Sequence, residues 1–146
     1  MELTVYGAYL FLAVFNAGNM VTLQIQHYAI YPYVGKENFK AYIEANNKAA
    51  FVPSILPAML LLLINIVLLF IRPAFMPVTV AAGSLALSIV SLISTFVWQR
   101  KIQGQMAVTG YDENKTHLLI STNWIRTFAF LVQGLLAVVF TITILK

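Results

Sequence analysis

Residues Ala49–Ile71 read AAFVPSILPAMLLLLINIVLLFI, and this stretch decides the fold. It contains no Asp, Glu, Lys or Arg, and a helix of this length spans the ~30 Å hydrocarbon core of a bilayer. Three further tracts without these four residue types surround it: Leu3–Gly35, Pro73–Gln99 and Thr127–Leu145. The sequence therefore predicts an all-α polytopic membrane protein, with four transmembrane helices in an antiparallel bundle.

The amino-acid composition is typical of a membrane protein. Hydrophobic residues make up 60% of the 146 residues and charged residues only 10%, whereas soluble domains carry about 25% charged residues. Four helices and their connections use the whole chain, so residues 1–146 are predicted to form one domain. The net charge of +4 comes from basic residues that flank apolar tracts. Membrane lipid is therefore the expected partner, and nucleic acid is not. The absence of cysteine excludes disulfides and thiolate metal sites.

Turn and proline signals set the predicted helix limits. The first helix is expected to stop at Tyr31-Pro32-Tyr33, and Gly110-Tyr111-Asp112 is expected to break the chain before the fourth. Pro53 and Pro57 should bend the second helix near its start. The predicted spans are about Leu3–Tyr28, Ala49–Ile71, Val78–Trp98 with an extension to Gln105, and a last helix that runs to Leu145.

A short polar helix is predicted between the first two spans. Phe39, Tyr42 and Ile43 recur at helical spacing within the segment Lys36–Glu44. This pattern is typical of an interfacial helix whose apolar face contacts either lipid or the bundle.

The distribution of Lys and Arg predicts the orientation. Arg72 and Lys146 lie on the side of the N-terminus, whereas the first and third connections hold six basic residues: Lys36, Lys40, Lys48, Arg100, Lys101 and Lys115. We expect these connections in the cytoplasm and both termini outside, in a bacterial inner (plasma) membrane.

Polar side chains within the first and fourth spans are the main candidates for a site, because polar groups in lipid are costly. They are expected to meet at the end that bears connections one and three. The candidates are Asn16, Asn19, Gln26 and His27 in the first helix, and Asn123, Arg126, Thr127, Gln133 and Gly134 along one face of the fourth. For Asn16, Asn19 and Gln133, hydrogen bonding between helices is the alternative interpretation.

Arg126 is the strongest single candidate. It lies about a dozen residues into the fourth helix, where a guanidinium needs carboxylates, carbonyls, an anionic ligand or water. Glu44 is the best carboxylate partner, and Glu37 lies seven residues earlier on the same face. Arg126 is thus either a structural ion pair or a substrate anchor.

His27 and His117 are the side chains whose ordinary pKa lies near neutrality. They are candidates for a proton-transfer pair, for axial haem ligands or for plain interfacial residues. No spacing typical of a metal site occurs, and no metal or cofactor is predicted. A ridge on the third helix (Ser84, Ser88, Ser91 and Thr95) favours close helix packing, and a homo-oligomer through this helix is one possibility.

Several short motifs resemble a family of small four-helix membrane proteins related to fungal anthrone oxygenases. The motifs are Asn46-Asn47-Lys48, Phe51-Val52-Pro53, Leu56-Pro57-Ala58, Trp98-Gln99 and Thr122-Asn123-Trp124-Ile125-Arg126-Thr127. The resemblance implies a cofactor-independent oxygenase in which His27 or His117 is the base. It also implies that Asn47, Asn123 and Arg126 hold the oxyanion of an enolate. The chain departs from the family pattern in having fewer His and Trp residues around its third connection.

Two classes of function therefore remain open. The first is an oxygenase or oxidoreductase acting on a lipophilic ring compound, with His27 and His117 as catalytic residues. Its expected substrate-binding residues are Asn16, Asn19, Gln26, Glu44, Asn47, Trp98, Asn123, Trp124 and Arg126. The second is a non-enzymatic scaffold, lipid-binding protein or accessory subunit of a membrane complex.

Overall fold

The computed structural model describes residues 1–144, and these are helical almost throughout. The order is α1 (Glu2–Thr22), η1 (Leu23–His27), η2 (Tyr28–Tyr33), α2 (Phe39–Ala49), η3 (Phe51–Ile55), α3 (Leu56–Phe70), α4 (Val78–Ser94), η4 (Thr95–Gln99), α5 (Arg100–Thr109) and α6 (Glu113–Ile144). Segments η1, η3 and η4 are π-helical and η2 is a 3₁₀ helix. Leu145, the predicted end of the last helix, and Lys146 lie outside the described residues.

Four continuous helical stretches are long and apolar enough to cross a membrane: Glu2–Tyr33, Phe51–Phe70, Val78–Thr109 and Glu113–Thr143. This confirms the all-α class and the four apolar helices. The first helix continues through Tyr33, beyond its predicted end, because the 3₁₀ segment η2 accommodates Pro32.

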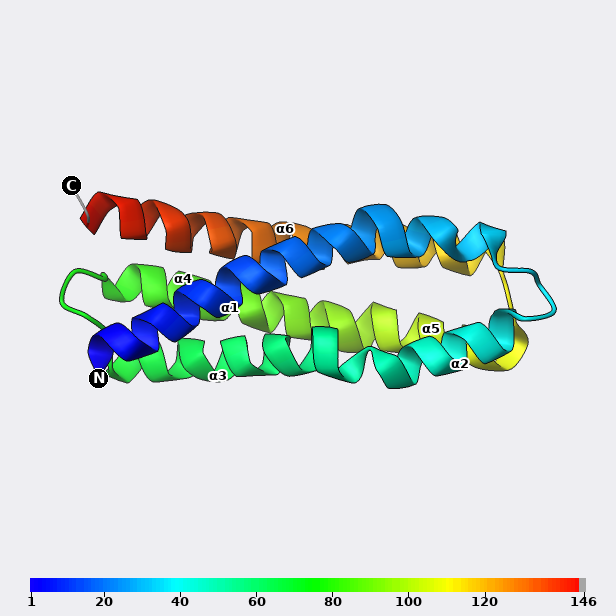
Figure 1. Ribbon diagram of the computed structural model, residues 1–146, viewed down its shortest axis with the longest axis horizontal. Coiled ribbons are helices and arrows are strands. Elements are labelled where there is room, and N and C mark those ends of the chain that lie inside the picture. The colour runs from blue at the N-terminus through cyan, green and yellow to red at the C-terminus, as the bar shows by residue number, and fades with distance from the viewer. Residues whose placement is uncertain (145–146) are drawn as a thin grey trace.

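The long helices lie side by side along one axis (Figure 1). The N-terminus, the end of α6 and the α3–α4 turn are at one end of this axis, which we call the terminal end. The connections 34–38 and 110–112 are at the other, the connection end. α1 and α4 each pack against both α3 and α6.

The bundle has two separate apolar cores. The core toward the terminal end is built mainly from α1, α3, α4 and α6 and contains Tyr9, Met20, Leu61 and Leu68. The core at the connection end consists of Tyr28, Tyr31, Phe39, Ile43, Ile102, Met106 and Leu119. Exposed charged residues such as Lys36, Lys40 and Lys101 lie at the same end of the bundle as this second core.

The short polar helix predicted between the first two spans is present as α2. Phe39 and Ile43 are fully buried in the second core, where α2 packs against α5. Figure 1 shows α2 continuing along the line of α3. Its apolar face thus contacts the bundle and not lipid, and the helix lengthens the bundle instead of lying across its end.

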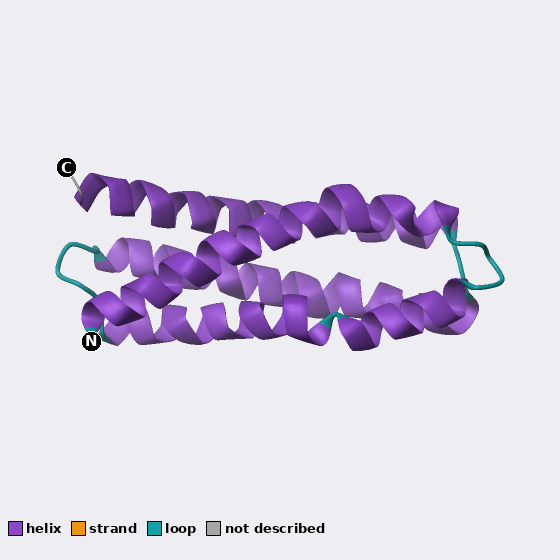
Figure 2. Ribbon diagram, in the orientation of Figure 1, coloured by secondary structure: helices purple, strands orange, loops and turns teal. Residues whose placement is uncertain are grey.

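The two prolines of the second span produce the predicted irregularity. Figure 2 shows an interruption between α2 and α3, at Ala50, and Pro53 lies in the π-helical segment η3 that follows. Pro57 has no N–H to donate to the carbonyl of Pro53 four residues earlier. The side-chain Nδ2 of Asn19 donates to that carbonyl instead, at 2.8 Å. α1 therefore supplies the hydrogen bond that the proline removes.

The serine ridge of the third span packs inside the chain. Ser84 Oγ lies 2.8 Å from the hydroxyl of Tyr9, and Gln133 Nε2 donates to the Ser84 carbonyl at 3.1 Å. Asn65 Nδ2 donates to Ser88 Oγ at 2.8 Å. These bonds confirm the interhelical role of Gln133. A homo-oligomer through this helix stays a prediction, and it would have to use the opposite face, which bears the exposed Gly83.

Gly134 marks a close approach of α1 and α6, which gives a testable prediction. A Cβ at this position would lie 3.0 Å from the Cβ of Ala17 and 3.3 Å from the carbonyl oxygen of Ala13. Gly134→Leu should therefore push the helices apart and lower the free energy of unfolding by about 3 kcal/mol. This value is at the upper end of the range that is typical of an overpacked core. Thermal unfolding in detergent measures this. Gly83→Leu is the matched control, because no atom lies within 4 Å of its added Cβ. Equal stability of Gly134→Leu and Gly83→Leu would contradict the close approach of α1 and α6 at Gly134.

Candidate functional site

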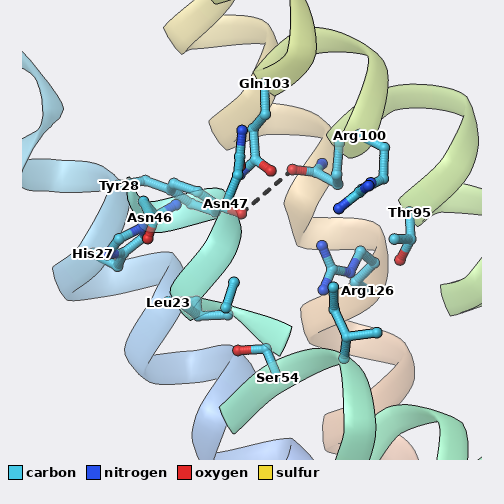
Figure 3. Close-up of a pocket in the computed structure, with 13 residues that line it drawn as sticks. Leu23, His27, Tyr28, Asn46, Asn47, Ser54, Thr95, Arg100, Gln103 and Arg126 are labelled. Atoms are coloured by element: carbon cyan, nitrogen blue, oxygen red, sulfur yellow. Dashed lines mark hydrogen bonds between the residues drawn. The ribbon is translucent and has the colours of Figure 1, made fainter. Parts of the chain in front are cut away.

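An inner cavity of about 60 Å³ lies between the two cores (Figure 3). Every long helical stretch contributes to its wall. The lining residues are Leu23, His27, Tyr28, Asn46, Asn47, Ala50, Ser54, Ile55, Thr95, Gln99, Arg100, Gln103 and Arg126. The cavity thus lies where the apolar half of the bundle meets the half that carries the charged connections.

All three π-helical segments meet at this cavity. Each contributes two lining residues: Leu23 and His27 from η1, Ser54 and Ile55 from η3, and Thr95 and Gln99 from η4. π-Helical turns are rare and occur frequently at functional sites, because they widen a helix and turn side chains out of the regular register. Three of them at one level single out this part of the bundle as the candidate site.

Arg126 lines the cavity from α6 without a carboxylate partner. Its side chain is only 9% exposed. One Nη lies 3.4 Å from the sulfur of Met20, a weak acceptor, and the Nε has no partner. Within residues 1–144 the salt bridges are Lys48–Glu44 and Lys115–Asp112, so neither holds Arg126. The guanidinium is therefore buried without a carboxylate, and its Nε donor is left unsatisfied.

The prediction that Glu44 pairs with Arg126 is wrong. Glu44 is exposed on α2, and its carboxylate lies 2.9 Å from the ammonium of Lys48 one turn later. The hydrogen bond and the charge of Lys48 hold the pKa of the Glu44 carboxyl below its usual range. Glu37, the second candidate, is also exposed. The face of α2 that points into the bundle carries Phe39 and Ile43 and no acid.

A second guanidinium faces the first. Figure 3 shows the side chains of Arg100, at the start of α5, and Arg126 extending toward each other. No Asp or Glu is among the lining residues. Tyr28 and Gln99 are joined by a hydrogen bond of 3.4 Å across the cavity, drawn as the dashed line in Figure 3. The cavity therefore combines two cations with neutral polar groups.

An outer groove of about 350 Å³ adjoins the inner cavity between α1 and the start of the second span. The two spaces share Leu23, His27, Asn46, Ala50 and Ser54. Only the groove is lined by Asn19, Thr22, Gln26, Ile30, Ala49 and Pro53. The five shared residues therefore form a common wall between the two spaces.

The structure brings together five of the residues predicted for the site. His27, Asn47 and Arg126 line the inner cavity, and His27 also lines the outer groove beside Asn19 and Gln26. Asn19 additionally bonds to Pro53, so it has a structural role as well.

Two of the side-chain amides that were predicted for the site form hydrogen bonds within the bundle instead. Asn16 donates to the carbonyls of Leu12 and Pro57, at 2.8 and 3.2 Å. Asn123 donates to Gln24 Oε1 at 2.8 Å. Neither lines the cavity, so these side chains specify how the helices pack.

Three aromatic candidates lie elsewhere. His117 is exposed near the start of α6 and does not line the cavity, so it does not form a pair with His27 there. Trp98 packs against the second core. Trp124 is 40% exposed and stacks on Phe128, with the ring centroids 5.2 Å apart.

Sequence reasoning missed several lining residues: Tyr28, Gln99, Arg100 and Gln103 as members of the site, and Asn46 as more than part of a motif. A signal for two of them was present. Thr95, Gln99 and Gln103 are four residues apart and continue the serine ridge toward the charged end. The ridge therefore changes from a packing surface to a cavity wall along its length.

The two spaces differ in size. The inner cavity, of about 60 Å³, has room for a few water molecules or a small polar group. The outer groove, of about 350 Å³, lies within the range of about 300–1,000 Å³ that is typical of pockets for drug-sized ligands. Within residues 1–144, no three side chains of His, Cys, Asp or Glu lie together to hold a metal ion.

Residues 1–144 form an all-helical chain with four helices apolar enough to cross a membrane and with a polar, cationic cavity toward their connection end. Comparison with protein-family models, curated proteins and solved structures finds no match to this chain.

Proposed function

We propose that the protein is an integral membrane protein that binds a lipid-soluble amphiphile in the outer groove and inner cavity. It would have four spans in an antiparallel bundle and a binding role of the non-enzymatic class. The observation that carries the proposal is a polar cavity, bordered by three π-helical segments, that shares five lining residues with a partly apolar groove.

Helix lengths support a position at the headgroup level. α6 has 32 residues, about 48 Å, and so exceeds the ~30 Å hydrocarbon core. Arg126 lies 18 residues before Ile144, about 27 Å along the axis, and Thr95 lies 17 residues after Val78, about 26 Å. If the terminal end marks one membrane surface, the cavity lies at the opposite edge of the core. There a polar headgroup and an alkyl chain meet.

An oxygenase is the second candidate, and one observation favours it. His27 lines both spaces, so a ring in the outer groove would lie beside a base, with Asn47 and Arg126 near its oxyanion. The inner cavity is too small for such a ring, which is why we place binding first. Oxygen uptake with anthrone-type substrates that stops in His27→Ala, while folded protein persists, would favour the enzyme.

Photo-crosslinking tests the binding role. A fatty carboxylate with a diazirine in its alkyl chain, added to protein in vesicles, should label the groove residues Leu23, Ile30 and Pro53 above the lipid-facing background at Phe11. Ala50→Phe should reduce labelling to background, because Ala50 borders both spaces. Ala45→Phe, on the exposed face of α2, is the matched control. Equal labelling at Phe11 and in the groove would show annular lipid only and would overturn the proposal.

The proposed orientation has its own test, since a chain without cysteine accepts single-cysteine labelling directly. The excess of basic residues in the first and third connections predicts that these face the cytoplasm of a bacterial cell. A membrane-impermeant maleimide should label Ala74→Cys, in the exposed α3–α4 turn, in intact cells. Glu37→Cys, in the first connection, should react only after lysis. The reverse pattern would contradict the orientation.

A further inference from the structure

We propose that the inner cavity is an oxyanion site, which holds the carboxylate or phosphate headgroup of an anionic amphiphile between Arg126 and Arg100. This inference rests on the proposed function, since it assigns a charge and a chemical class to the ligand that the groove would bind.

The first step is the state of Arg126. A buried guanidinium is strongly disfavoured unless it is paired and its donors are satisfied. Here the residue is nine-tenths buried and its Nε has no partner. One Nη lies 3.4 Å from the thioether sulfur of Met20, and the Tyr28 hydroxyl is the other polar group that interacts with the guanidinium. The guanidinium points into the cavity (Figure 3). An anion in the cavity would supply the missing acceptors.

The second step is the position of Arg100. Arg100 is an exposed residue whose side chain extends toward the buried Arg126, and no Asp or Glu borders the cavity to offset the repulsion between the two charges. An oxyanion between them removes the repulsion and accepts charge-assisted hydrogen bonds from both. The planar guanidinium fork also matches the geometry of carboxylate and phosphate.

The remaining wall suits the same ligand. Asn46, Asn47 and Gln103 are neutral amides that can donate further hydrogen bonds to an oxyanion. The volume of about 60 Å³ is suited to a headgroup's oxygens and excludes a ring system.

The outer groove lies directly beside the cavity and would hold the alkyl chain. The groove shares five lining residues with the cavity and continues past Ile30, Ala49 and Pro53. An amphiphile in this position would keep its charge at the edge of the hydrocarbon core and its chain against apolar side chains.

Headgroup variation at constant chain length tests the inference. We would measure dissociation constants by calorimetry for the full chain in an uncharged detergent, with dodecanoate, dodecyl phosphate, dodecanol and dodecyltrimethylammonium as probes. The two anions should bind at least about tenfold more tightly than dodecanol, and the cation should not bind. Inorganic phosphate and acetate form a further arm, which separates an amphiphile headgroup from a free anion.

Variants locate the effect. Arg126→Gln should weaken dodecanoate binding by about tenfold or more, and Arg126→Lys should recover part of it, because the charge remains while the fork is lost. Arg100→Gln should weaken binding severalfold. Lys101→Gln is the matched control: it removes one positive charge beside Arg100, from an exposed side chain that does not line the cavity. Melting curves of each variant establish that it is folded.

Four outcomes would overturn the inference. Dodecanol binding as tightly as dodecanoate would remove the oxyanion site but leave the amphiphile pocket. Failure of all amphiphiles to bind would remove both proposals. Inorganic phosphate binding as tightly as dodecyl phosphate would overturn the amphiphile as ligand. Equal effects of Lys101→Gln and Arg126→Gln would assign the charge preference to the surface and not to the cavity.

Discussion

Arg126→Met is expected to make the ligand-free protein more stable, by about 1–4 kcal/mol. The variant keeps a long unbranched side chain and removes a buried charge that has no carboxylate partner. If Arg126 served packing alone, its replacement would destabilise the bundle. A gain in stability together with a loss of dodecanoate binding would show that the arginine is retained for a ligand.

Thermal unfolding of delipidated protein in uncharged detergent measures this prediction. Asn123→Leu, one turn earlier on α6, is the matched control. It also replaces a buried polar side chain by an apolar one, but it leaves Gln24 Oε1 without its donor. We expect it to lower stability by about 1–2 kcal/mol. A lower melting temperature for Arg126→Met than for the unchanged protein would refute the prediction.

Phe39→Ala should destabilise the connection end by about 3–5 kcal/mol. Phe39 is fully buried in the second core and packs edge-on against Tyr31 and Tyr111, with ring centroids 5.5 and 5.3 Å apart. Its removal leaves a cavity between α2 and α5. Because these helices supply Asn46, Asn47, Arg100 and Gln103 to the site, ligand binding should weaken as well.

Hydrogen exchange resolves where the loss occurs. Amides of α2 and α5 should exchange faster in Phe39→Ala, while those of α3 keep their protection, because the two cores are separate clusters. Tyr33→Ala is the control, since its side chain is 88% exposed. An equal rise in exchange across α3 would mean that the two halves unfold as one unit.

The position of the site between two cores suggests why the bundle is longer than a membrane needs. The apolar half places Arg126 and the groove at the proposed edge of the hydrocarbon core. The charged half adds α2 and α5. The side chains of Asn46 and Asn47 on α2, and of Arg100 and Gln103 on α5, line the cavity on the side of the connection end. Neither half contains the whole site.

The amino-acid sequence by itself determined the elements and one functional face. Tracts without charge predicted the four apolar helices, since helix length follows from residue count alone. The face of α6 was also correct: Asn123, Arg126, Thr127, Gln133 and Gly134 are all buried. That extrapolation succeeded because α6 is a regular α-helix throughout, so a period of 3.6 residues holds from end to end.

Tertiary structure decided the rest of the site. In the first helix, the predicted shared face is kept only in part: Asn19, Gln26 and His27 line the outer groove, whereas Asn16 is buried against Pro57. The π-helical segment η1 begins after Asn19, so the regular helical period does not hold at Gln26 and His27. Likewise, the distance of Glu44 from Arg126 depends on how α2 is rotated against α5. Glu44 is exposed there, and its i, i+4 ion pair with Lys48 is a local contact within α2. Spacing along one helix is a local property. Which side chains face each other across a cavity depends on how several helices are rotated about their own axes.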